Sequence, residues 1–301
     1  MHYSGGEGMP RILTQIRRAV WLALEHDLFN IAKAAAYSGI LAFFPAVLAF
    51  TAFLAQVPEG STMVGDLRNS FEQFLPPGSL ALLQGSLSAR PMQSTSLIIS
   101  ATALAVMAGI GVMLSLMEGF RRCYGLNQGS WGFWQRWLRG LMLVPIVLVP
   151  LTLASLLLVF GHQIEAWMIA NADHDLRNIV LVFWRLARWA LAAATAVTVL
   201  AALYHFGTRR KEHWAWVLPG AATAAFIWFP STLVFGWYVT LKANYSRFYG
   251  SFGAGIATLV WLYLTSFSTL LGAELNGVLY RRRQDRGRST QTQTDLASNS
   301  R

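Results

Sequence analysis

The sequence predicts an all-α membrane protein with six transmembrane helices, accompanied by interfacial and periplasmic amphipathic helices. Of the 301 residues, 54% are hydrophobic and only 13% are charged, whereas soluble domains carry about 25% charged residues. So few charges leave too little polar surface to cover a water-soluble globule. The chain also contains six long apolar stretches, and a helix needs about 20 such residues to cross a bilayer.

These stretches divide the chain into an arm, a membrane domain and a tail. We expect a cytoplasmic amphipathic arm over residues 1–32 and a six-helix domain over residues 33–283. Residues 284–301 are rich in Ser, Thr, Gln and Asn, so they predict a disordered cytoplasmic tail. The predicted spans cover residues 33–56, 96–118, 140–161, 185–206, 216–240 and 252–280.

The positions of Lys and Arg predict the orientation of the chain. Sixteen of these 24 residues lie in the arm, the second and fourth connections, and the tail, whereas five lie in the other connections. Loops rich in Lys and Arg stay cytoplasmic, so we expect both termini inside, at a bacterial inner membrane. We therefore expect the net charge of +10 to orient the chain in the membrane and to attract anionic lipid headgroups. We expect no nucleic-acid partner, because the chain has no recognisable nucleic-acid module.

Apolar residues recur at helical spacing in three segments outside the spans. Residues 13–24, beside Arg17 and Arg18, predict a helix on the inner membrane surface. The tryptophan-rich residues 131–139 predict a second interfacial helix on the same side. On the outer side, residues 64–87 predict two helices separated by a pair of prolines. These outer helices either cap a cavity or cover the bundle.

Two stretches carry a family resemblance. The first runs Lys33-Ala-Ala-Ala-Tyr-Ser-Gly-Ile-Leu-Ala-Phe-Phe-Pro45. The second opens with Tyr249-Gly-Ser-Phe-Gly-Ala-Gly255 and ends with Leu271-Gly-Ala-Glu-Leu-Asn276. Together they resemble the YihY family, also called the virulence factor BrkB family and once misnamed ribonuclease BN, over residues 20–283. The chain has Ala42 where relatives commonly have Ser, so any role of that hydroxyl does not carry over.

The resemblance implies a place in the bacterial inner membrane. It also implies a role in exporting an envelope lipid or glycolipid, or in serum resistance. No established activity comes with it.

Three ionisable residues lie near the predicted cytoplasmic ends of the spans, namely Lys33, Glu118 and Glu274. An ionisable group inside a membrane costs about 2.5–3.5 kcal/mol on insertion scales, so each is a candidate functional residue. We expect Lys33 to lie near enough to pair with either carboxylate. In the functional interpretation, these residues line a polar cavity for a charged headgroup, together with Tyr37 and Asn276. In the structural interpretation, a buried ion pair and Asn276 fix the helix packing, and both interpretations stay open.

Three prolines, Pro45, Pro219 and Pro230, lie inside predicted spans. Each removes one backbone hydrogen bond. Helix breaks of this kind line the binding sites of transporters, although isolated prolines are also tolerated as kinks in membrane helices.

Enzyme motifs are absent from the sequence. Six histidines occur, but none falls into a metal-binding spacing, and the single Cys123 excludes an intramolecular disulfide. We therefore expect no enzyme, no metal and no cofactor. Our leading hypothesis is a transporter or translocator of an amphipathic envelope component, a lipid or glycolipid. The alternative is a non-transporting membrane scaffold or envelope-integrity factor.

Overall fold

The computed structural model describes residues 11–54, 95–126, 132–171, 177–208, 213–241 and 252–299. Nearly all of these residues are helical. The helices are α1 (Arg11–Glu25), α2 (Leu28–Leu54), α5 (Thr95–Cys123), α6 (Phe133–Asn171), α7 (Arg177–Gly207), α8 (Trp214–Leu241) and α10 (Phe252–Asn299). The predicted outer helices within residues 64–87 lie outside the described residues.

Six of the helices are long and apolar enough to cross a membrane. The apolar segments are Leu28–Phe50, Ile98–Cys123, Phe133–Ala154, Val182–Gly207, Trp214–Val239 and Gly255–Gln284. Each overlaps one predicted span, so the all-α class and the six-span prediction are confirmed.

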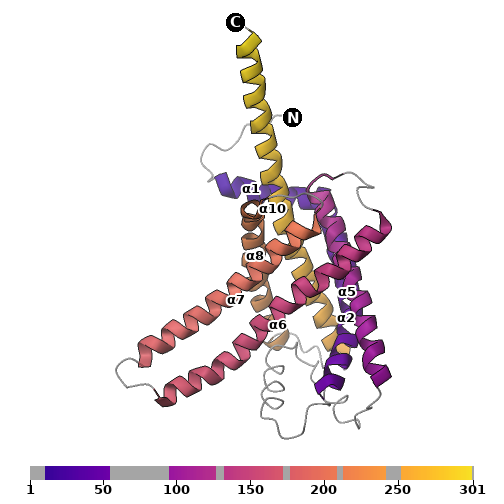
Figure 1. Cartoon of the computed structure of the whole chain (residues 1–301), viewed down its shortest axis with the longest axis vertical. Helices are drawn as coiled ribbons and strands as arrows, with labels where there is room; N and C mark the ends of the chain where they lie inside the picture. The colour runs from indigo at the N-terminus through magenta and orange to yellow at the C-terminus, as the bar shows by residue number, and fades with distance from the viewer. Residues whose placement is uncertain are drawn as a thin grey trace.

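The spans pack as two groups, with α1 lying across one end (Figure 1). Helix α2 packs on α5 and α10, and α10 packs on α8. Helices α6 and α7 pair with each other and diverge from the other spans towards the end opposite α1 (Figure 1). The end that carries α1 is also where α5 and α7 end and α6 and α8 begin (Figure 1).

Two segments differ from the sequence-based expectation. Residues 133–139, expected to form a separate interfacial helix, are the first turns of α6. Helix α10 continues to Asn299 through the residues for which the sequence predicted a disordered tail. In both places no proline interrupts the backbone, so hydrogen bonding continues from the neighbouring span.

The prolines do not break their helices. Helix α2 continues through Pro45, and α8 continues through both Pro219 and Pro230. The structure therefore corrects the expectation of helix breaks at these three positions. A single missing backbone hydrogen bond leaves the bonds before and after it intact, and membrane helices tolerate such a gap.

The core is concentrated at the end of the bundle nearest α1. Leu28, Phe120, Tyr204 and Leu270 are fully buried there, each from a different helix. The ring of Phe120 meets the ring of Tyr204 edge-on, with the centroids 5.3 Å apart. The Tyr204 hydroxyl donates to the Thr269 carbonyl oxygen at 2.7 Å, so α5, α7 and α10 are joined at one level.

Candidate functional site

Glu274 is the centre of a polar contact that joins three parts of the chain. Its side chain is 0% exposed, and its Oε2 lies 2.7 Å from His26 Nδ1. A carboxylate only accepts hydrogen bonds, so the tautomer of His26 with a proton on Nδ1 is the one that donates in this contact. Arg281, two turns further along α10, donates to Glu274 Oε1 at 2.9 Å and to the Cys123 carbonyl oxygen at 3.1 Å. Glu274 therefore connects α10 to the end of α1 and, through Arg281, to the end of α5.

Asn276 points to a different neighbour. Its Oδ1 accepts from the Gly220 backbone N–H at 2.8 Å, and its Nδ2 donates to the Val217 carbonyl oxygen at 3.0 Å. Residues two positions apart on a helix are separated by about 200° around its axis. Glu274 and Asn276 therefore face nearly opposite sides of α10. Both hydrogen bonds are buried, so the Asn276 side chain fixes α8 against α10.

The glycines beside these two residues complete the packing. A Cβ at Gly272 would overlap the Gly220 carbonyl oxygen of α8, and one at Gly277 would overlap the Cys123 carbonyl oxygen of α5. The segment from Gly272 to Gly277 therefore brings α10 against two helices by backbone contact. This geometry explains why the segment combines small and polar residues.

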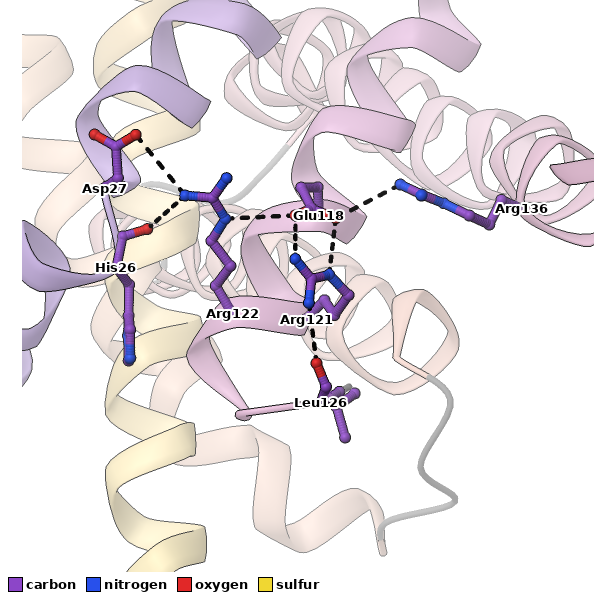
Figure 2. Close-up of polar contacts among 7 residues, drawn as sticks. All are labelled: His26, Asp27, Glu118, Arg121, Arg122, Leu126 and Arg136. Carbon is purple, nitrogen blue, oxygen red and sulfur yellow. Dashed lines mark hydrogen bonds and ion pairs between the residues drawn. The ribbon is translucent and has the colours of Figure 1, made fainter. Parts of the chain in front are cut away.

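A second polar cluster surrounds Glu118 on α5 (Figure 2). Arg121 Nε donates to Glu118 Oε2 at 2.9 Å, and Arg122 Nε lies 3.4 Å from Oε1. Arg136, from the first turn of α6, places an Nη atom 3.7 Å from Oε2. The side chains of Arg122 and Arg136 are 38% and 41% exposed. Three guanidinium groups thus share one carboxylate at the surface of the bundle.

The turn between α1 and α2 is held by the same cluster. Arg122 donates to the His26 carbonyl oxygen at 3.3 Å and lies 3.8 Å from Asp27 Oδ2 (Figure 2). Asp27 has a φ of 58°, a left-handed conformation that Asp adopts more readily than most residues. Its Oδ1 accepts from Asn30 Nδ2 at 2.7 Å. Even with Asp27 counted, three arginines face two carboxylates, and this end of the bundle keeps a surplus of positive charge.

Lys33 and Tyr37 do not join this site. Lys33 Nζ donates to Asn30 Oδ1 at 3.2 Å, so the structure does not show the expected pairing of Lys33 with a carboxylate. Tyr37 is 63% exposed. The buried positions of this segment include Ile31 and Ala35, which lie two residues before Lys33 and Tyr37 and therefore on the other side of α2. Lys33 and Tyr37 thus share an outward face, while the Glu274 carboxylate is buried.

The sequence did not predict which residues pair with Glu274 and Glu118. Arg281 lies seven residues after Glu274, a spacing that places both on one helix face. His26 comes from the arm, 248 residues away, and Arg136 comes from another helix. The spacing i, i+7 could have identified Arg281, but no local signal identifies His26 or Arg136.

Within the described ranges, no group of three or more His, Cys, Asp and Glu side chains could hold a metal ion.

Comparisons with known proteins give a consistent set of relatives. The family described as Virulence factor BrkB matches residues 22–297. A protein named ribonuclease-like protein YfkH, from Bacillus subtilis (strain 168), is 26% identical over 251 residues, 83% of this chain and 89% of that protein. A UPF0761 membrane protein of Chromohalobacter salexigens is 26% identical over 278 residues, 91% of this chain and 65% of its relative. The chain thus spans just under two thirds of the Chromohalobacter protein. No solved structure matches.

Proposed function

Because the chain belongs to the virulence factor BrkB family, we propose that it is an inner-membrane protein that translocates an anionic, amphipathic envelope component, a lipid or glycolipid. In this proposal the end that carries α1 faces the cytoplasm, and both termini lie on that side. The arginines at the end of α5, at the start of α6 and along α1 support this orientation.

The arginine cluster around Glu118 is the observation that carries the proposal. Arg122 and Arg136 are partly exposed, and their shared carboxylate does not neutralise them. A guanidinium group binds phosphate through two parallel hydrogen bonds. An anionic headgroup at the membrane surface can therefore contact the exposed parts of these two side chains, beside their contacts with Glu118, Asp27 and the His26 carbonyl oxygen. We propose that this contact is the first step of translocation.

In this proposal Glu274 and Asn276 have a structural role. Every side-chain oxygen of Glu274 and both ends of the Asn276 amide have partners within the protein. They keep α10 in place while the headgroup binds elsewhere. The same observation also favours a second candidate function, a scaffold whose buried polar residues only hold the helices together.

Lipid translocation in proteoliposomes tests the proposal. Fluorescent phosphatidylglycerol and fluorescent phosphatidylcholine are compared, with dithionite added outside to bleach the outer leaflet. We expect the wild-type protein to move the anionic lipid at least several-fold faster than empty liposomes do. Arg122→Gln combined with Arg136→Gln is expected to remove most of this rate.

Arg283→Gln is the matched control. Like each of Arg122→Gln and Arg136→Gln made alone, it removes one positive charge at the same end of the bundle. Arg283 lies over the ring of Trp216 at 4.8 Å and outside the Glu118 cluster. Thermal unfolding of each variant in detergent shows whether it is folded. A folded double variant with the wild-type rate contradicts the role of Arg122 and Arg136. A wild-type rate equal to that of empty liposomes for both lipids contradicts phospholipid translocation and leaves the scaffold function.

A further inference from the structure

Helix α1 has one face that is fixed to the membrane domain. Ala19 and Ala23 are buried, and Ala19 packs with Leu275 and Val278 of α10. Because alanine side chains are short, the axis of α1 lies close to α10. Its larger apolar residues are therefore available on the other sides of the helix.

The outward side of α1 carries two different flanks. Val20 and Leu24 are exposed, and Trp21 is 71% exposed. With 3.6 residues per turn, these three residues follow one another around one flank of the helix. Arg18 and Glu25, both exposed, occupy the other flank. The helix thus presents a protein-facing side, an apolar side and a charged side.

The position of α1 matches the surface of a bilayer. It lies across the end of the bundle rather than along it (Figure 1), and the first apolar span begins at Leu28, three residues after α1 ends. The intervening turn is held by the bond from Arg122 to the His26 carbonyl oxygen and by the contact of His26 with Glu274. Helix α1 is therefore fixed at the level where the spans leave the membrane.

We propose that the apolar flank of α1 is a binding surface for anionic phospholipid in the adjoining leaflet. Val20, Trp21 and Leu24 enter the boundary between headgroups and acyl chains, a region where tryptophan is enriched. Arg17, exposed between Leu24 and Trp21 around the helix, extends its charged end to a lipid phosphate. Arg18 and Glu25 face water. This proposal needs only the six membrane spans and does not depend on translocation.

The full-length chain with one added cysteine, labelled with the environment-sensitive dye NBD, tests this surface. The native Cys123 is the only cysteine of the chain, and it is fully buried, so unsubstituted protein measures background labelling. Labels at Trp21→Cys and Leu24→Cys are compared with labels at Arg18→Cys and Glu25→Cys. All four samples are placed in nanodiscs of phosphatidylcholine, with or without one quarter phosphatidylglycerol.

We expect iodide to quench the dye at positions 21 and 24 several-fold less than at positions 18 and 25. We also expect that difference to grow when phosphatidylglycerol is present, and Arg17→Gln to remove the growth. Equal quenching at all four positions overturns the proposal. Protection at positions 21 and 24 that persists in detergent and rises with protein concentration also overturns it, because a second copy of the chain then covers the flank.

Discussion

Gly220 of α8 and Gly272 of α10 face each other so closely that neither position has room for a side chain. A Cβ on Gly272 would overlap the Gly220 carbonyl oxygen, the Tyr204 hydroxyl and the Ala224 side chain. A Cβ on Gly220 would overlap the Gly272 carbonyl oxygen and the amide of Asn276. Backbone atoms on both sides leave little to move aside, so this contact sets the distance between the two spans.

Gly272→Ala is expected to destabilise the protein. Inserting a methyl group into a packed core costs about 1–3 kcal/mol. Because the contact is with backbone atoms, we expect a cost at the upper end of this range. The free energy of unfolding in detergent measures the effect. Gly236→Ala on α8 is the control, since its Cβ would meet nothing within 4 Å. Equal stability of the two variants would show that the spans are further apart than the structure has them.

Asn276→Ala is expected to lower stability without affecting any contact outside the α8–α10 pair. The change leaves the Gly220 N–H without its side-chain acceptor and the Val217 carbonyl oxygen without its side-chain donor. A buried polar group that loses its partner costs about 1–3 kcal/mol. Asn276→Asp is the informative comparison, because it keeps an acceptor for Gly220 and places a charge beside Val217. A stable Asn276→Asp variant would contradict the hydrogen-bond assignment.

Glu274→Gln is expected to loosen the attachment of α1. The amide keeps the size of the side chain but removes the charge that faces Arg281 and His26. Hydrogen bonds to charged groups contribute about 1.5–3 kcal/mol. We expect lower thermal stability and faster proteolysis within α1. If proteoliposome activity per folded molecule falls instead, while stability holds, then Glu274 has a functional role.

Lys33→Gln is expected to change stability by less than about 0.5 kcal/mol, as exposed surface substitutions usually do. The exposed Lys33 ammonium contacts Asn30 Oδ1, and the described carboxylates of Glu118 and Glu274 take their partners elsewhere. Thermal unfolding of Lys33→Gln is measured beside that of Glu274→Gln, so that the two changes in stability are compared directly. A loss as large as that of Glu274→Gln would mean that Lys33 is the partner of Glu274 after all.

Trp228→Phe is expected to cost little. Trp228 Nε1 donates to Thr265 Oγ1 at 3.0 Å between α8 and α10. Side-chain hydrogen bonds inside membranes contribute about 0.6 kcal/mol on average, so we expect a small drop in unfolding free energy. Trp237→Phe on the exposed surface of α8 is the control. A difference above about 2 kcal/mol would show that this bond has a larger role than membrane hydrogen bonds usually have.

The sequence predicted the number and approximate limits of the spans because hydropathy is a local property. It also identified Glu274 and Asn276 as special, since polar residues inside a span are rare. Their partners were not predictable in the same way. Contacts such as that of His26 with Glu274 join residues 248 positions apart, and the spacing of residues along one helix carries no information about them.

The functional interpretation of the predicted cavity depended on which way side chains face. Lys33 and Tyr37 lie one turn apart on a helix, and that much followed from the sequence. Whether their shared face turns inward depends on the neighbours of α2, and the structure turns it outward. The prolines show a similar limit, because the chemistry of Pro45 predicts a lost hydrogen bond but not whether the helix continues.

Because α6 and α7 diverge from the other spans (Figure 1), the membrane domain is wider at the end opposite α1 than at the end that carries α1. Helix α6 has 39 residues, about 58 Å at 1.5 Å per residue, which is far longer than the hydrocarbon core of about 30 Å. Tilting accommodates such a helix. The molecule therefore occupies more area in the leaflet away from α1 than in the leaflet beside it.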